Sequence, residues 1–236
     1  MSEFSERDSR AINRYNLVVD EILSHERALS RIAVRGLKIQ TIIDVGASDG
    51  SWSVMAKNFW PWAQCHLIEA YPYWRDALEE LTTTVPGFSY TLAAAGKQKG
   101  ITYFSVRGDD PYSGASQMAN TKGAFQVDQV SLDDDVESRP LIGPFLIKLD
   151  THGADLDILA GANRTLKETK LIVAEVYNFQ SSEKRFPKFC IHLEELGFRC
   201  VDIAAPLFRP RDGAFYQFDI LFVREGDAAF MNDAFF

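Results

Sequence analysis

The sequence predicts an α/β fold with a seven-stranded, mostly parallel sheet, helices on both faces and an antiparallel hairpin at one edge. Short runs rich in Val, Ile and Leu alternate with segments of helical periodicity, as in a parallel sheet with crossover helices. Several of these runs end in an acidic residue. The last two runs, 198–203 and 215–223, have no helical segment between them, so we expect them to pair antiparallel.

The composition is that of a globular enzyme, with 236 residues of which 46% are hydrophobic and 25% charged. The net charge of −8 argues against general binding of nucleic acid, because phosphate contacts need a basic face. No run reaches the roughly 18 apolar residues of a membrane span, and the N-terminus lacks the apolar core of a signal peptide. The cysteines lack Cys-x-x-Cys spacing, which favours free thiols. We therefore expect cytoplasmic localisation, no nucleic-acid partner and no membrane insertion.

Residues 11–37 carry apolar side chains at three- and four-residue spacing, which predicts a helix that ends near Gly36. We expect residues 1–40 to form an N-terminal helical segment that packs on the core, and residues 41–236 to form one domain. A contact between two copies of the chain is the alternative role of the helix, so a homo-oligomer stays open.

The stretch 41–50 combines a strand, a glycine turn and the start of a helix. Thr41–Val45 is a β-branched apolar run with Asp44 near its end, and Gly46 and Gly50 bracket the turn that follows. In open α/β sheets this arrangement forms a ligand crevice at the carboxyl ends of the strands. Glycine permits close approach of the backbone to a ligand, and N–H groups at the helix start can face a carboxylate or phosphate. The alternative is a turn that binds nothing.

Two further strands are predicted over residues 65–69 and 88–94. Glu69 ends the first, about 20 residues beyond the glycine turn, where an acid accepts hydrogen bonds from ribose hydroxyls in nucleotide-binding units. The alternative is a solvated acid at a strand end. The small residues 93–96 end the second strand and would let a flat base lie close to the backbone. Tight packing is the alternative reason for them.

Residues 100–136 form the least regular part of the chain. Residues 101–106 alternate like an edge strand, 107–118 have the composition of a loop, and 125–132 predict another short strand. The acids Asp133–Asp135 are most simply a solvated run of charge. A metal site there is disfavoured, because adjacent residues do not share a face.

The second half of the chain predicts strands over 144–150 and 171–176, with Asp150 and Glu175 near their ends. Helices are predicted over residues 74–81, 154–166 and 183–196. His152 lies in the turn after the strand that ends in Asp150. Asp155 falls in the first turn of the following helix, where a carboxylate interacts favourably with the helix dipole.

This order of elements resembles the Rossmann-like class I S-adenosylmethionine-dependent methyltransferase fold. Several stretches also resemble the FkbM methyltransferase family, and the Leu-Ile-Lys-x-Asp-x-x-Gly-Ala block is the most specific of them. The stretches are Ile43–Gly50, Leu67–Ala70, Phe145–Asp155, Ile158–Ala162 and Phe218–Val223, together with a Gly/Ser loop at 113–116. The resemblance covers about residues 41–223. Ser48 stands where the family usually has Asn, His152 where it often has Glu or Gln, and Asp155 where it often has Glu.

The resemblance implies S-adenosylmethionine as cofactor. The cofactor-binding residues that it implies are Asp44, Gly46, Ala47, Ser48, Gly50, Glu69, Ala70, Ala93, Ala94 and Asp150. The residues at 44–50 would hold the methionine end, Glu69 the ribose hydroxyls, and the chain near Ala93 and Ala94 the adenine. Asp150 would contact the amino group of the cofactor or orient a catalytic base.

The resemblance and the positions of the residues also suggest catalytic roles. A hydroxyl acceptor must lose its proton as it attacks, and imidazole titrates near neutral pH. His152 is therefore the candidate general base, with Asp150 and Asp155 as the further catalytic candidates. A second arrangement would place Mg²⁺ on oxygen atoms of Asp150, Glu175 and Asn178 to lower the pKa of the acceptor. We favour the arrangement without a metal.

The expected function is methyl transfer to a hydroxyl of a sugar, glycan or natural product, and this acceptor class rests on the family resemblance alone. A degenerate methyltransferase fold that serves as a scaffold is the alternative. A nicotinamide-dependent oxidoreductase is a weaker one, because Ala47 and Ser48 stand where its Gly-x-Gly-x-x-Gly motif would need another glycine.

Overall fold

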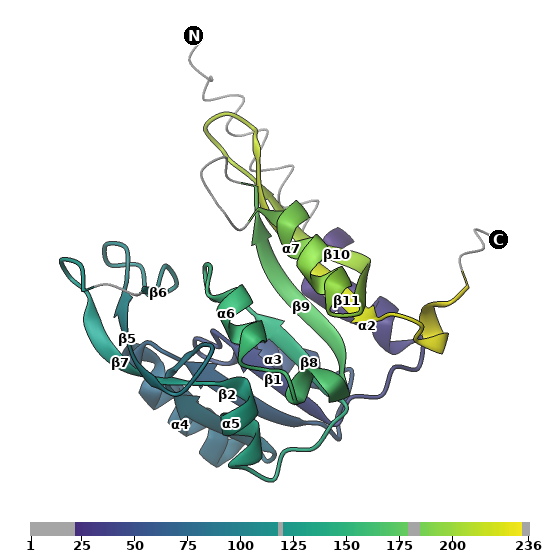
Figure 1. Cartoon of the computed structure of the whole chain (residues 1–236), viewed down its shortest axis with the longest axis horizontal. Helices are drawn as coiled ribbons and strands as arrows, with labels where there is room; N and C mark the ends of the chain where they lie inside the picture. Colours follow the sequence, from purple (N-terminus) through teal and green to yellow (C-terminus); the bar gives the residue numbers. More distant parts are fainter. Residues whose placement is uncertain (1–21, 118–119, 179–184, 233–236) are drawn as a thin grey trace. The chain divides into compact units, whose positions relative to one another are not determined.

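The computed structural model describes residues 22–117, 120–178 and 185–232 (Figure 1). The described chain divides into two units, one of residues 38–172 and one made by the segments on either side of it. Strand β9 (Thr169–Tyr177) runs through the boundary. The predicted division at residue 40 stays a prediction.

The main sheet has seven strands among the described residues, in the order β10-β11-β9-β8-β1-β2-β3. In the unit of residues 38–172, β8, β1, β2 and β3 pair in parallel, and in the other unit β10 and β11 pair antiparallel. The bounds are β1 Thr41–Val45, β2 Gln64–Glu69, β3 Phe88–Leu92, β8 Phe145–Leu149, β10 Phe198–Phe208 and β11 Phe215–Arg224. The predicted α/β fold, mostly parallel with an antiparallel hairpin at one edge, is confirmed.

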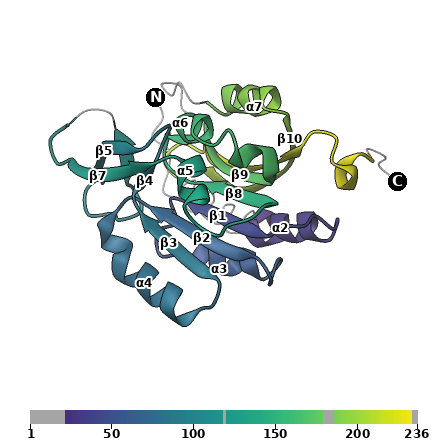
Figure 2. The same ribbon diagram turned by 60° about the horizontal axis from the view of Figure 1, so that its bottom comes forward.

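Helices cover both faces of the parallel strands in the unit of residues 38–172. Figure 2 shows α3 and α4 on one side of β1, β2 and β3, and α5 and α6 on the other. The alternation of β2 explains this, because Leu67 lies beneath the α3–α4 side whereas His66 faces α5. The helix bounds are α2 His25–Ala33, α3 Ser51–Lys57, α4 Arg75–Thr84, α5 Leu132–Glu137, α6 Asp155–Ala160 and α7 Phe186–Glu195. Short 3₁₀ turns occupy Pro72–Trp74, Thr165–Glu168 and Ala228–Phe230.

Two predicted helices differ from the structure. The helix expected over 154–166 is two pieces, α6 and a 3₁₀ turn, separated near Gly161. A Cβ on Gly161 would lie 2.4 Å from the carbonyl oxygen of Gly96. Only a residue without a side chain therefore lets the backbone at Gly96 pass this close. Within the helix expected over 11–37, the structure has α2 and a helical residue pair at 22–23 that is separated from it by Ser24, and residues 11–21 lie outside the described part. Residues 183–184 of the last predicted helix also lie outside it.

A second sheet accounts for the irregular middle of the chain. Among the described residues it has four strands, in the order β4-β7-β5-β6. Figure 1 labels β5, β6 and β7. The bounds are β4 Ala94–Ala95, β5 Gly100–Ser105, β6 Ala115–Gln117 and β7 Phe125–Val130. The prediction of an edge strand at 101–106 is wrong, because β5 has a partner on each side. Its alternation reflects one buried face, on which Phe104, Val127 and Ala94 pack together.

The prediction that Asp133–Asp135 form a solvated run of charge is also wrong. These acids lie in α5, where Asp133 and Asp135 are buried and only Asp134 is exposed. The carboxylate of Asp133 accepts hydrogen bonds from the backbone N–H groups of Arg164 and Thr165. Asp135 is paired with His66. A buried acid is tolerated here because donors from distant parts of the chain meet it.

Helix α2 packs on the long strands of its own unit. It buries Ala28, Leu29 and Ile32, and Arg31 makes a two-point contact with Asp202 of β10 at 2.8 and 2.9 Å. The hydrogen bond from Arg31 to Asp202 raises the pKa of the guanidinium. The three cysteines, all within the described residues, are free thiols. No helix in the described part of the chain is both long and apolar enough to cross a membrane.

Replacing Gly46 by Ala tests the close approach of β1 and β8. Gly46 has φ +81°, and a Cβ there would lie 2.0 Å from the carbonyl oxygen of Asp150. We expect the free energy of unfolding to fall by about 3 kcal/mol, from a left-handed alanine plus overpacking against a fixed backbone. Urea unfolding followed by circular dichroism measures it.

Gly123→Ala is the matched control. Gly123 has φ +89° in the same unit, but nothing lies within 4 Å of its missing Cβ. The free energy of unfolding of Gly123→Ala should therefore fall only by the cost of a left-handed alanine backbone, about 1 kcal/mol. Equal losses in the two variants would contradict the steric role of Gly46.

Candidate functional site

The turn after β1 is fixed by its neighbours in the protein. The backbone N–H of Gly46 donates to the carbonyl of Ile68 at 2.9 Å, and its missing side chain leaves room for the carbonyl of Asp150. At Gly50, φ +80°, a Cβ would lie 2.5 Å from the side chain of Leu81 in α4. Both predicted glycines are thus required locally by packing of the chain on itself, a reason that the sequence interpretation did not give.

Glu69 is buried at the end of β2, with 5% of its surface exposed. Its two carboxylate oxygens accept hydrogen bonds from the backbone N–H groups of Ser48 at 2.8 Å and Tyr71 at 2.7 Å. Burial raises the pKa of Glu69, although these backbone hydrogen bonds oppose the rise. The alternative of a solvated acid is therefore wrong. A carboxylate has about four acceptor sites, so the fixed carboxylate can still accept from a ligand hydroxyl.

Ser48 belongs to this arrangement through its backbone. It has φ +50°, a left-handed conformation that few non-glycine residues adopt. That conformation accompanies the hydrogen bond from its N–H to Glu69. Ala47 is buried beside it, and Ala70 packs against the cluster of Phe104 and Val127.

The small residues after β3 are used in packing. Ala93 and Ala94 are each 2% exposed, and Ala94–Ala95 forms strand β4, which pairs with β7. The side chain of Ala94 contacts Phe104 and Val127. The alternative given from the sequence, tight packing, therefore holds for the side chain of Ala94. A role of this segment in binding adenine stays a prediction.

Lys148 is a site residue that sequence reasoning missed. Its Nζ lies 2.8 Å from Asp150 Oδ2, 3.8 Å from Asp44 Oδ1 and 5.4 Å from the centre of the Trp52 ring. Lys148 is 4% exposed and Asp44 is fully buried, and the two residues are register partners on β8 and β1. The oxygen Asp44 Oδ2 also accepts from Ser53 Oγ at 2.7 Å. The signal was present in the sequence as a lysine inside an apolar strand with an acid two positions later.

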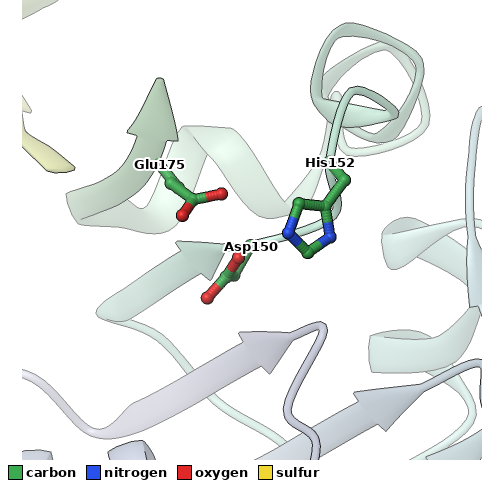
Figure 3. Close-up of side chains that lie close together, drawn as sticks. All are labelled: Asp150, His152 and Glu175. Atoms are coloured by element: carbon green, nitrogen blue, oxygen red, sulfur yellow. The ribbon is translucent and has the colours of Figure 1, made fainter. Parts of the chain in front are cut away.

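His152 lies in a strained turn after β8 (Figure 3). His152 has φ +52° and Gly153 has φ +119°. The Nδ1 atom of His152 lies 2.9 Å from the carbonyl oxygen of Gly114, and a carbonyl can only accept, so Nδ1 carries a proton. In the neutral ring Nε2 is then the basic nitrogen. A ligand atom of Asp150 and one of His152 lie within 4.8 Å of each other.

Gly114 was not predicted to orient His152. It lies in the loop between β5 and β6, inside the Gly/Ser stretch 113–116. A Cβ on Gly114 would lie 2.3 Å from the ring of Phe104, so only glycine lets the loop pass over that ring. The carbonyl that holds the imidazole is therefore placed by the second sheet.

Asp155 closes the same turn. It is 6% exposed, and its Oδ1 accepts from the hydroxyl of Thr151 at 2.9 Å, at the start of α6. This contact fits the structural alternative, a carboxylate in the first turn of a helix. A catalytic role for Asp155 stays a prediction.

The remaining predicted residues belong to the other unit. Figure 3 also draws Glu175, which in its own unit accepts hydrogen bonds from the hydroxyl of Tyr177 and the amide of Gln217. The side-chain oxygen of Asn178 accepts from Arg185 at 3.5 Å. The Mg²⁺ arrangement on Asp150, Glu175 and Asn178 stays a prediction.

Comparisons with known proteins place the chain in a family. The model of the methyltransferase FkbM domain matches residues 44–200. The solved structure of an FkbM methyltransferase from Methylobacillus flagellatus aligns with TM-score 0.51 and 15% identity over 84% of this chain, which spans 47% of that protein. Magnesium protoporphyrin IX methyltransferase from Synechocystis PCC 6803, solved with bound SAM, aligns with TM-score 0.47 and 11% identity, covering 95% of this chain and 86% of that one. No curated protein matches.

The first of these structural likenesses shows the fold, and the family match covers well over half of the sequence. The matched range contains Glu69, Lys148, Asp150 and His152. The chain belongs to the methyltransferase FkbM domain family.

Proposed function

We propose that this chain is an S-adenosylmethionine-dependent methyltransferase that acts on a hydroxyl of a sugar, glycan or natural product. The observation that carries the proposal is the buried, preoriented carboxylate of Glu69 at the end of β2 in a chain of this family. The acceptor class comes from the family alone.

The residues at the ends of β1, β2 and β8 fit the cofactor. The ribose of S-adenosylmethionine offers two hydroxyl donors, and Glu69 is an acceptor whose backbone hydrogen bonds already fix it. The methionine part carries a cationic amino group, for which Asp150 is a half-buried carboxylate at the end of β8. Lys148 shares that carboxylate, so a bound amino group would have to be accommodated beside it. When bound, the cofactor supplies an activated methyl group on a sulfonium.

The protein would contribute alignment and proton removal. In-line displacement at a methyl carbon depends on holding donor and acceptor together. The basic Nε2 of His152 is suited to take the proton of the attacking hydroxyl, because the carbonyl of Gly114 holds the proton on Nδ1. His152 is exposed, so an acceptor can reach it from solvent. The loop that carries Gly114 thereby orients the proposed base on the side from which an acceptor would approach.

Calorimetric titration with S-adenosylmethionine, S-adenosylhomocysteine and NAD tests the cofactor site. We expect the first two to bind and NAD not to bind. Glu69→Gln should weaken both by at least about tenfold, because a hydrogen bond to a charged acceptor is lost. Glu80→Gln, which changes an exposed acid on α4, is the matched control and should bind like the wild type. Binding of NAD alone would overturn the proposal.

The affinity for S-adenosylmethionine should also depend on pH through Glu69. The ionised carboxylate accepts from hydroxyls and attracts a cation, so protonation weakens binding as the pH falls. Because burial raises the pKa of Glu69, the loss should begin above the ordinary glutamate value of about 4.3. Titrations from neutral to acidic pH measure it. If Glu69→Gln keeps the same pH profile, another group is responsible.

His152→Gln should lower methyl transfer by about 100-fold with cofactor affinity unchanged, because the general base is lost. Transfer of labelled methyl groups to a panel of monosaccharides and glycosides gives the rate, and calorimetry gives the affinity. His192→Gln, which changes a partly exposed histidine on α7, is the control. Wild-type turnover in His152→Gln would place the base elsewhere.

A further inference from the structure

A second group of titratable side chains lies at the middle and start of β2 and β3, away from Glu69. His66 of β2 is fully buried, and its Nδ1 lies 2.8 Å from the hydroxyl oxygen of Ser89 on β3. Its Nε2 lies 2.5 Å from Asp135 Oδ2 on α5. His66 and Ser89 are register partners on neighbouring parallel strands. Serine, histidine and aspartate thus form one hydrogen-bonded chain.

Arg139 joins this chain just beyond α5. Its Nη2 donates to the hydroxyl of Thr91 at 2.6 Å, and Thr91 donates to Asp135 Oδ1 at 2.9 Å. The Nε atom of Arg139 lies 3.4 Å from Asp135. Burial alone would raise the pKa of Asp135, but the hydrogen bond and charge of His66, with Thr91 and Arg139, hold it below its usual value. Asp135 is therefore ionised, so His66 Nε2 carries a proton.

Ser89 and Arg139 also line a cavity of about 180 Å³. It opens where β2 and β3 begin, at Gln64 and Phe88, whereas Glu69 lies where β2 ends. Phe88, Pro140 and Leu141 give it apolar walls, and no acidic side chain from the described part of the chain lines it. The cavity is thus separate from the candidate methyl-transfer site within the same unit.

The cavity offers donors for an anion. Among the described residues, Arg139 makes its hydrogen bonds through Nε and Nη2, so its two Nη1 donors remain for a bound group. Guanidinium prefers carboxylate, sulfate and phosphate groups. Ser89 supplies a hydroxyl on the same wall. We propose that this cavity is a proton-linked binding site for a small oxyanion, held by Arg139 and Ser89.

The link to protons follows from the chain of hydrogen bonds. When His66 is neutral, its Nδ1 accepts the hydroxyl proton of Ser89, and the serine turns lone pairs toward an incoming anion. When His66 is protonated, Nδ1 donates to the serine oxygen. The serine hydroxyl can then donate its own hydrogen bond to the anion. The groups that face His66 are Ser89 and Thr91 from β3 and Asp135 from α5, with Arg139 behind them. Anion binding therefore takes up a proton and strengthens as the pH falls.

Calorimetric titration of the full chain with sodium sulfate at several pH values tests the site, because sulfate keeps its charge throughout. Arg139→Gln should weaken binding by at least about tenfold at every pH, as expected for loss of a charged donor. Ser89→Ala should retain part of the affinity and lose its pH dependence. Arg164→Gln, an exposed arginine paired with Glu137 outside the cavity, is the matched control and should bind like the wild type.

Other results would overturn the proposal. Equal sulfate affinity in Arg139→Gln and Arg164→Gln would mean that sulfate binds elsewhere. An unchanged pH dependence of sulfate binding in Ser89→Ala would contradict the proposed link between anion binding and proton uptake. Arg139→Lys keeps a cation beside Asp135 if Arg139→Gln fails to fold, and it should still bind more weakly than the wild type. Methyl sulfate distinguishes the source of the group, since tighter binding than sulfate indicates the anionic end of an organic ester and weaker binding a free ion.

Discussion

The ends of β1 and β8 depend on the balance of charge around Lys148. A buried ammonium group is costly unless carboxylates and polarisable groups replace its water. Asp44 and Asp150 supply two carboxylates, and the ring of Trp52 covers a further side. Because Asp44 and Lys148 are register partners, this pairing also fixes β1 against β8, so that the chain at Gly46 fits under the carbonyl of Asp150. The residues proposed to meet the cofactor are attached to this frame.

The backbone is strained in the turns after β1 and β8, where ligand binding is proposed. Ser48 and His152 are both non-glycine residues with positive φ, each in a turn directly after a parallel strand. Each strained turn is compensated by a hydrogen bond across the structure, Ser48 to Glu69 and His152 to Gly114. Such strain is maintained only where the surroundings determine the conformation. Both groups are therefore held in place before any ligand arrives.

The sequence predicted what local pattern controls. The strand that ends at Val45 was predicted from its β-branched composition, Glu69 from its spacing to the glycine turn, and Asp150 from its place at the end of an apolar run. The sequence did not predict pairs of interacting residues that lie far apart in the chain. Asp135 looked solvated because its neighbours are acids, yet its partner His66 is 69 residues away. The second sheet was missed for the same reason, because pairing of short strands is decided by contacts and not by their own composition.

The contrast between two buried acids shows how the structure separates their roles. Glu69 receives only neutral backbone donors and lies near the charge of Asp44, so burial prevails and its pKa rises. Asp135 is equally hidden from solvent but faces His66 and Arg139, and its pKa falls. An acid without a cationic partner gains most from a ligand that brings hydroxyl donors or positive charge. An acid already paired with a histidine and an arginine gains little, and instead holds those side chains in position. On this argument we propose that Glu69 meets a ligand directly, whereas Asp135 positions His66 and Arg139.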